Sequence, residues 1–254
     1  FGSSYLQVLV ALHSSSSSSS SSSIVQSEMP SLKLTYFPFE GIAEKVRLAF
    51  AVTETPFEDF RVPREEWPNL KETTPFGQIP VLEITEDDGK TKALAESGAM
   101  LRYIARRFDK TGTLYPIDPE SLAEVEEMLH LADDLWREVL PLFLMKNGKQ
   151  FKFGLPADWK EKDEVMSTLA NHLATVEFPK YMKSFTARLE KTGGYVCFAD
   201  QMTIADLQWL PICRLFESQG MGTLPAGLMD PFPVVKAWMN KMYENPQIRK
   251  WYEL

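Results

Sequence analysis

The chain has 254 residues, of which 44% are hydrophobic and 24% charged, a balance typical of a globular protein with one large or two ordinary domains. Its formal net charge of −8 argues against nucleic-acid binding, which depends on a basic surface. Only two cysteines occur, Cys197 and Cys213, so we expect free thiols in the reducing cytoplasm and no disulfide scaffold or zinc site. Since no apolar run approaches the length of a membrane span, we also expect no membrane partner.

The N-terminal residues 1–30 are set apart by an unbroken serine run from Ser14 to Ser23. A serine repeat cannot bury enough apolar surface to offset the entropy lost on ordering, so we expect this segment to be disordered. Two interpretations stay open. One is a Ser-rich leader such as a transit peptide, and the other is a non-native extension ahead of Met29.

Residues 31–111 carry the pattern of a small α/β domain. Apolar and polar residues alternate from Leu32 to Phe37, as in a half-buried strand, and helical spacing follows from Ala43 to Val52. A strand at 57–62 completes a βαβ unit, which we expect to be parallel and right-handed. The remaining expected elements are a short helix at 67–72, hairpin strands at 81–85 and 91–94, and a helix from Ser97, its cap, to Phe108. The order β-α-β-α-β-β-α is that of a thioredoxin-like domain.

Residues 120–254 are expected to be all-helical, after a Gly- and Pro-containing linker at 109–119. Thr203 and Asp206 have the spacing of a helix cap and its third residue, so we expect them to be structural residues that start a helix. The other expected helices lie at 122–144, within 159–192 as a pair, at 233–243 and at 246–252. The predicted fold class is therefore α/β plus all-α, with the thioredoxin-like domain first.

A turn around Pro75 and Gly77 leads to Ile79-Pro80, where a cis peptide bond would fit, and then to a β-prone run. A residue held extended before proline can pair its backbone with an incoming peptide, in the manner of an added strand. Glu96-Ser97 then opens a helix, whose N-terminus attracts a carboxylate. Together these features predict a site for a small, acidic, peptide-like ligand such as glutathione.

These motifs, in this order, resemble the cytosolic glutathione transferases, and most closely the sigma class, which includes the glutathione-dependent prostaglandin D synthases. The resemblance spans about residues 31–254. It implies a homodimer of the glutathione transferase fold, with glutathione as co-substrate and no metal, in which 31–111 bind glutathione and 120–254 contribute the electrophile site. The segments that carry it are Leu34–Phe37, Ala43–Arg47, Glu66–Pro68, Thr74–Leu82, Glu96-Ser97, Asp133-Asp134 and Thr203–Asp206.

The resemblance also assigns roles to single residues. Tyr36 would be catalytic, donating a hydrogen bond to the glutathione sulfur and so favouring the thiolate, the reactive nucleophile. Its alternative role is that of a strand aromatic packed in the core. Besides Tyr36 at the sulfur, the resemblance implies three groups of glutathione-binding residues in this domain. They are Trp67 and Lys71 at the glycine end, Gln78, Ile79 and Pro80 at the cysteinyl unit, and Glu96 and Ser97 at the glutamyl unit. Asp134 of the partner subunit is also implied to bind glutathione.

The residues of the electrophile pocket are the hardest to predict from the sequence, because aromatic residues at helical spacing more often pack in the hydrophobic core. Five residues could line it: Phe37, Phe39, Trp136, Leu140 and Phe143. A metal-binding stripe at Glu126, His130 and Asp134 is the weaker interpretation of a pattern that usually means surface charge, so we expect no metal.

Two positions depart from the sigma pattern. Ile42 stands where an arginine is usual, and Gln78 where a lysine is frequent, so both remove positive charge beside an anionic ligand. Lys45 and Arg47 are expected on other faces of their helix, and Glu40 is expected to make the site mouth acidic.

Three functions follow from this resemblance. The first is conjugation of glutathione to hydrophobic electrophiles, and the second is a glutathione-dependent isomerisation of the prostaglandin type. The third is a crystallin-like binding or structural role with little catalysis, which the substitutions at Ile42 and Gln78 keep open.

Overall fold

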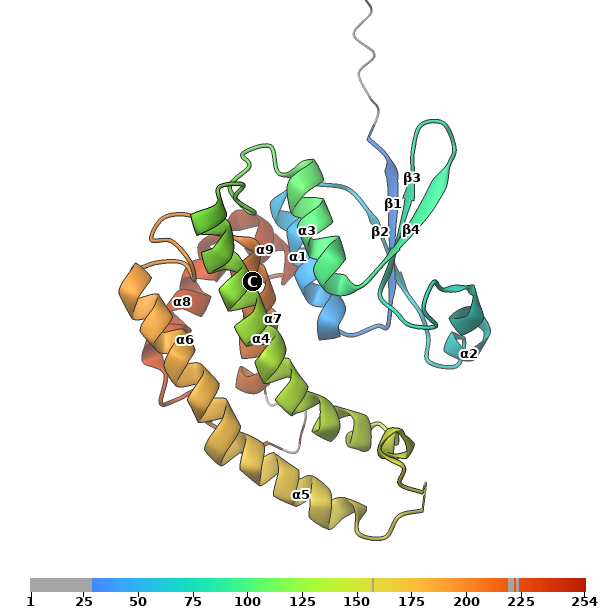
Figure 1. Ribbon diagram of the computed structural model, residues 1–254, viewed down its shortest axis with the longest axis vertical. Helices are drawn as coiled ribbons and strands as arrows, with labels where there is room; N and C mark the ends of the chain where they lie inside the picture. The colour runs from blue at the N-terminus through green and yellow to red at the C-terminus, as the bar shows by residue number, and fades with distance from the viewer. Residues whose placement is uncertain (1–28, 157, 219–221, 223) are drawn as a thin grey trace, which may run out of the picture.

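The computed structural model describes residues 29–156, 158–218, 222 and 224–254, so the expectations for residues 1–28 lie outside the described residues. A sheet flanked by helices forms one part of the molecule and a bundle of longer helices forms the other (Figure 1). This is the expected architecture of a thioredoxin-like domain followed by an all-helical domain.

The sheet has four strands in the order β2-β1-β3-β4. β1 pairs in parallel with β2 and antiparallel with β3, as the crossover through the first helix requires. The alternation predicted for β1 is present, since Leu32, Leu34 and Tyr36 are buried on one face. The strands are β1 Ser31–Tyr36, β2 Glu58–Arg61, β3 Val81–Thr85 and β4 Thr91–Ala95.

Two helices cover the sheet and contact each other, and a third, very short helix lies apart from them beyond the strand ends (Figure 1). The predicted element order β-α-β-α-β-β-α is confirmed, although β2 is shorter than the predicted strand at 57–62. The helices of this part are α1 Glu44–Val52, preceded by the 3₁₀ turn η1 Gly41–Ala43, α2 Trp67–Leu70, followed by η2 Lys71–Thr73, and α3 Ser97–Phe108.

The remaining helices form the second part, where α4 lies beside α5 and α6 (Figure 1). α4 is longer than predicted at both ends and contains Pro141 without ending there. The elements are α4 Pro119–Lys146, η3 Gln150–Phe153, α5 Lys162–His172, the π-helical turn η4 Leu173–Glu177, α6 Phe178–Thr192, α7 Ile204–Glu217, α8 Pro233–Glu244 and α9 Pro246–Trp251. Within the described part of the chain, no helix is long and apolar enough to cross a membrane.

The start of α7 is fixed by a buried carboxylate. Asp206 accepts hydrogen bonds from the backbone N–H of Thr203 and of Val196, both at 2.8 Å, and from the Trp238 indole at 3.0 Å. Thr203 in turn accepts from the Ala205 N–H, which gives a capping box. Asp206 therefore ties the beginning of α7 to the preceding loop and to α8, and α7 forms the centre of the second part.

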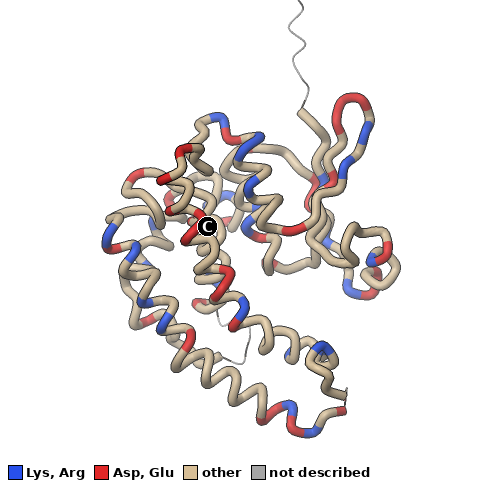
Figure 2. The backbone as a smooth tube through the Cα atoms, viewed as in Figure 1, with Lys and Arg blue, Asp and Glu red and all other residues tan. Residues whose placement is uncertain are grey.

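α1 connects the two parts, because it packs on α3 within its own domain and on α7 and α9 across the domain boundary. Figure 2 shows acidic and basic residues interspersed along the helices, not gathered into a basic stripe. The loop after β1 and the start of α1 meet α4 and α7 at this boundary, and the candidate site lies there.

Candidate functional site

Tyr36 ends β1 with its side chain almost fully buried, at 6% exposure. The loop that follows closes over the phenol: Gly41 has a φ of +50°, and a Cβ there would come within 2.6 Å of the Tyr36 hydroxyl oxygen. Only glycine allows this approach. Burial raises the pKa of Tyr36 to about 12, while a hydrogen bond from the Ile42 backbone opposes the shift. The phenol is therefore protonated at neutral pH and can donate a hydrogen bond.

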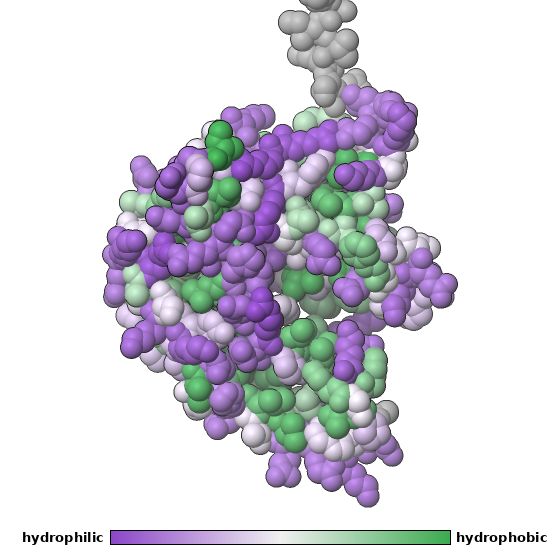
Figure 3. Space-filling view, in the orientation of Figure 1, coloured by the Kyte–Doolittle hydropathy of each residue, from purple (hydrophilic) through white to green (hydrophobic). Residues whose placement is uncertain are grey.

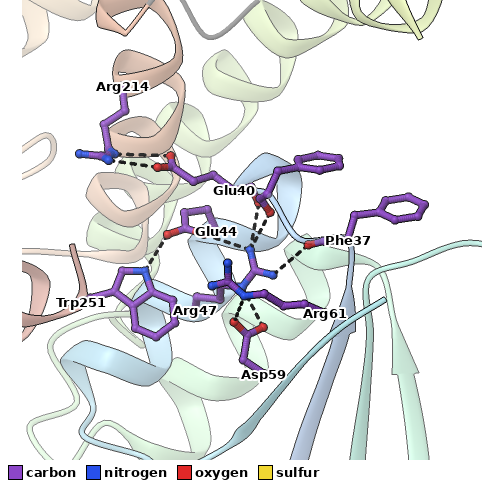
Figure 4. A network of polar contacts seen from close by, with 9 residues as sticks. Phe37, Glu40, Glu44, Arg47, Asp59, Arg61, Arg214 and Trp251 are labelled. Atoms are coloured by element: carbon purple, nitrogen blue, oxygen red, sulfur yellow. Dashed lines mark hydrogen bonds and ion pairs between the residues drawn. The ribbon is translucent and has the colours of Figure 1, made fainter. Parts of the chain in front are cut away.

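The loop between β1 and α1 is held by the fully buried Arg47. Its guanidinium donates to the carbonyl oxygens of Phe39 at 2.9 Å, Glu40 at 3.2 Å and Phe37 at 3.4 Å (Figure 4). The guanidinium carbon lies 5.7 Å from the centre of the Tyr36 ring. Arg47 thus fixes the backbone on which the position of Tyr36 depends. Arg47 is not among the residues that line the cavity described below.

Two carboxylates balance the buried Arg47 charge. Glu44 lies 3.1 Å from its Nη1 and Asp59 of β2 lies 3.0 Å from its Nε. Glu44 also accepts a hydrogen bond at 2.7 Å from the indole of Trp251, at the end of α9, and Asp59 accepts one from Arg61 (Figure 4). The first loop is therefore linked to the sheet and to the C-terminal helix through one ionic network.

The turn before β3 has the shape expected from its sequence. The Ile79–Pro80 peptide bond is cis, and both residues are buried, whereas Gln78 is exposed. Glu96, a non-glycine residue, has a φ of +68°, an uncommon backbone conformation that is frequent at binding sites. Ser97 is the first residue of α3 and is 8% exposed. The prediction that Ser97 caps α3 is wrong, because Glu96 occupies the cap position and no side chain makes the capping hydrogen bond.

Trp67 and Lys71 lie on the short α2–η2 segment. Trp67 is half-buried with its ring 5.9 Å from Phe37 in an edge-on contact, and Lys71 is exposed. The contact with Phe37 places Trp67 beside the loop that follows β1. Trp67 is therefore packed against Phe37, whereas the side chain of Lys71 is exposed to solvent.

A cavity of about 580 Å³ lies between the first loop and helices α4 and α7. Figure 3 shows hydrophobic residues around the notch between the two parts of the molecule. Three of the five predicted pocket residues line it: Phe39, Trp136 and Phe143. Sequence reasoning missed the apolar residues that α7 contributes, Pro211, Ile212 and Leu215, because a helix buried on most sides shows no distinct face.

The other two predicted pocket residues, Phe37 and Leu140, do not line the cavity. Phe37 is stacked against Phe39 at 5.7 Å between the ring centres and turns its edge to Trp67, so it supports the lining from behind. Leu140 is 36% exposed on the outer side of α4. Both expectations were wrong because the direction of a side chain from a loop or a long helix depends on its tertiary neighbours.

The charges around the cavity also differ from expectation. Glu40 is paired with Arg214 of α7, with 3.0 Å between Oε1 and Nη2, so the acid does not stand alone at the mouth (Figure 4). Arg214 was missed, although a charged residue among apolar helix neighbours usually has a partner, which is a signal in the sequence. Lys45 also lines the cavity, together with Ile42 and Ser97, so the expectation that it faces elsewhere is wrong.

The two neighbouring acids of α4 point in different directions. Asp133 lines the cavity and accepts a hydrogen bond at 2.7 Å from Gln208 of α7. Asp134 pairs with Arg137 and borders a separate shallow hollow beside His130 and Arg188. The role of Asp134 in a partner subunit stays a prediction, since one chain is described.

The side chains considered above as a metal-binding stripe on α4 contact protein side chains. Glu126 binds Arg102 of α3 and accepts a hydrogen bond at 2.7 Å from the Tyr115 hydroxyl, while His130 lies 3.8 Å from the same carboxylate. Among the described residues, no group of three metal-ligating side chains comes together. The carboxylate of Glu126 thus serves as a structural link between α3 and α4.

Comparison with known proteins agrees with this geometry. A glutathione S-transferase N-terminal domain profile matches residues 32–106, and a glutathione S-transferase C-terminal domain profile matches residues 155–253. The chain is 33% identical over 225 residues to the probable glutathione S-transferase 7 of Caenorhabditis elegans, an alignment that covers 89% of this chain and 97% of that protein.

Two further relatives bear on substrate and class. The chain is 30% identical over 224 residues to the hematopoietic prostaglandin D synthase of Mus musculus, with 88% of this chain and 96% of that protein covered. The structure of the Fasciola hepatica sigma class glutathione transferase matches with a TM-score of 0.70 at 26% identity, covering 88% of this chain and 96% of that chain.

Proposed function

The chain belongs to the glutathione S-transferase family, and from this premise we propose that it conjugates glutathione to hydrophobic electrophiles, with Tyr36 as the catalytic residue. The observation that carries the proposal is the buried, protonated phenol at the end of β1, which packs against Phe39 and Gly41 of the cavity lining. A neutral phenol donates a hydrogen bond to the glutathione sulfur and stabilises the thiolate over the thiol. The thiolate then attacks the electrophile.

Glutathione binding would be divided among three segments of residues 31–111. The backbone of Ile79, which precedes the cis-proline, pairs with the cysteinyl unit, with Gln78 beside it. Ser97 and the N-terminus of α3 receive the glutamyl carboxylate, and Glu96 faces the glutamyl amino group. Trp67 and Lys71 hold the glycine end. These contacts place the sulfur near Tyr36 and convert the attack into a proximity-assisted step.

The electrophile would bind in the cavity to which residues 120–254 contribute most of the lining. Trp136, Phe143 and the apolar residues of α7 favour an apolar second substrate. We further propose a cytoplasmic homodimer, in which Asp134 of the partner subunit reaches the glutamyl amino group. Two buried free thiols suit a reducing compartment.

A second candidate function is a glutathione-dependent isomerisation of the prostaglandin type, favoured by the 30% identity to a hematopoietic prostaglandin D synthase. In this reaction the thiolate attacks one peroxide oxygen, which forms an S–O bond and breaks the O–O bond to give an alkoxide that takes up a proton. Loss of the proton on the adjacent carbon then forms a carbonyl, breaks the S–O bond and releases the thiolate, so glutathione is not consumed. A third possibility is a crystallin-like role with little catalysis. Product analysis with an aryl halide and with a cyclic peroxide separates the three functions. Conjugation depletes glutathione, isomerisation converts the peroxide without depleting glutathione, and a structural protein converts neither substrate.

The test of the proposal is Tyr36→Phe, which removes one hydroxyl and keeps the ring. We expect the variant to bind glutathione nearly as the wild type does, while kcat/KM for an aryl halide falls about 10- to 100-fold, the value of one hydrogen bond to a charged group. Tyr103→Phe, on α3 away from the cavity, is the matched control and should conjugate normally. Unchanged turnover by Tyr36→Phe would refute the assignment.

A further inference from the structure

Lys45 occupies an unusual place in the cavity. It lies on α1, about one helical turn after Ile42, and its side chain is only 11% exposed. Its Nζ donates to the Gln208 side-chain oxygen at 3.1 Å and lies 3.9 Å from Asp133. These two partners come from α7 and α4, so the ammonium is held at the point where three helices from both domains meet.

Burying an ammonium in such a place is costly unless opposite charge offsets the lost hydration. Burial lowers the pKa of Lys45, the charge of Asp133 raises it, and the charges of Arg102 and Glu96 lower and raise it, respectively. Asp133 is 45% exposed, and its 3.9 Å separation from Nζ is long for an ion pair. The single acid therefore neutralises the ammonium only in part, and the cavity side remains able to accept an anion.

We propose that Lys45 binds the α-carboxylate of the glutamyl unit of glutathione, and so supplies the positive charge that Ile42 cannot. The inference rests on the proposed function, because it concerns the same ligand. Lys45 and Ser97 line the same cavity, and Ser97 begins α3, whose N-terminal N–H groups also attract a carboxylate. In this arrangement the positive charge lies about one helical turn after Ile42, the position at which the resemblance leads one to expect an arginine.

The same arrangement suits the second charge of the glutamyl unit. The unit carries an ammonium beside its carboxylate, and Asp133 lies next to Lys45 within the same cavity. Lys45 and Asp133 together thus present one cation and one anion to a zwitterion. This adds a second acid of the same chain to the proposed glutamyl site, besides Glu96 and the acid expected from a partner subunit.

The alternative is that Lys45 only braces α1 against α4 and α7. The two roles differ in what can replace the lysine. A brace depends on the hydrogen bond to Gln208, whereas an anion site depends on positive charge at the cavity wall. Since Ile42 lines the same wall, a cation introduced there can restore the charge without restoring the brace.

The experiment measures binding of S-methylglutathione, which has no ionisable thiol, by calorimetry at pH 7 with the full chain. We expect Lys45→Met to bind about 10- to 100-fold more weakly, the value of one charge-assisted contact. Lys92→Met, on the exposed face of β4, is the matched control and should bind as the wild type does. Lys45→Arg, which keeps the charge, should stay within about three-fold.

The double variant Ile42→Arg with Lys45→Met decides between the roles, and we expect it to recover at least about ten-fold of the lost affinity. Normal binding by Lys45→Met would overturn the inference. So would an affinity loss that follows a lower unfolding midpoint and that Ile42→Arg does not restore, since this is the behaviour of a brace. If the wild type itself did not bind S-methylglutathione, the proposed function would fail and not the role of Lys45 within it.

Discussion

The first loop, residues 37–42, and the segment 67–78 border the two sides of the proposed glutathione site, and they are held by different means. The first loop is fastened by the buried guanidinium of Arg47 through three backbone carbonyls. In the second segment the threonine side chains bond locally, with Thr73 and Thr74 donating to the carbonyls of Leu70 and Lys71, both at 2.8 Å. The side that would hold the reacting sulfur is thus built into the core, whereas the side that would hold the glycine end is built on the surface.

This difference suits the chemistry. A hydrogen bond to a thiolate requires a donor that is already oriented, because reorganisation during the reaction would raise the barrier. The glycine carboxylate of glutathione takes no part in bond making, so its contacts need only supply affinity. Local stability is expected to be higher in the first loop than in the α2–η2 segment.

The largest effect is expected for Arg47→Met, which removes the guanidinium and leaves Glu44 and three carbonyls without their partner. Breaking a buried ion pair on one side should lower the free energy of unfolding by about 3–5 kcal/mol. Arg61→Ala, which removes an exposed partner of the same Asp59, should cost less than about 1 kcal/mol. Denaturant unfolding of both variants measures the contrast. Equal losses would show that burial of Arg47 does not distinguish the first loop.

The next effect concerns the titration of Tyr36. Because burial disfavours the charged phenolate, the folded protein binds this proton more tightly than the unfolded chain does. Stability from this group is therefore present below pH 10 and is lost as the pH rises towards 12. The tyrosinate absorbance of wild type minus Tyr36→Phe should appear only above about pH 11, whereas an ordinary tyrosine titrates near 10. A midpoint near 10 would mean that solvent reaches the phenol.

The smallest effect is expected on the surface side of the site. Lys71→Ala should weaken glutathione binding only about two- to five-fold, since exposed ion pairs contribute little and are screened by salt. The loss should shrink further as the salt concentration rises. Lys110→Ala, exposed in the linker after α3, serves as the control and should bind normally. A loss as large as that expected for Lys45→Met would show that the glycine end is anchored as firmly as the glutamyl end.

Much of the fold could be read from local pattern. Alternation in β1, helical spacing in α1, the hairpin before α3 and the Thr203–Asp206 cap each depend on residues within a few positions of one another. The turn before Ile79–Pro80 could also be predicted from local sequence, because Pro75, Gly77 and Pro80 lie within six positions of one another. One local prediction was wrong, that of the capping residue of α3. Ser97 begins this helix without capping it, since Glu96 takes the cap position.

The sequence by itself thus determined the order of elements and the motif around Tyr36, since both follow from short-range geometry. Only the tertiary structure decided which charges line the cavity. Lys45 and Gln208 are 163 positions apart and meet because α1 packs on α7 across the domain boundary. The same packing pairs Glu40 with Arg214 of α7, so the charges that line the cavity come from residues that no local pattern connects.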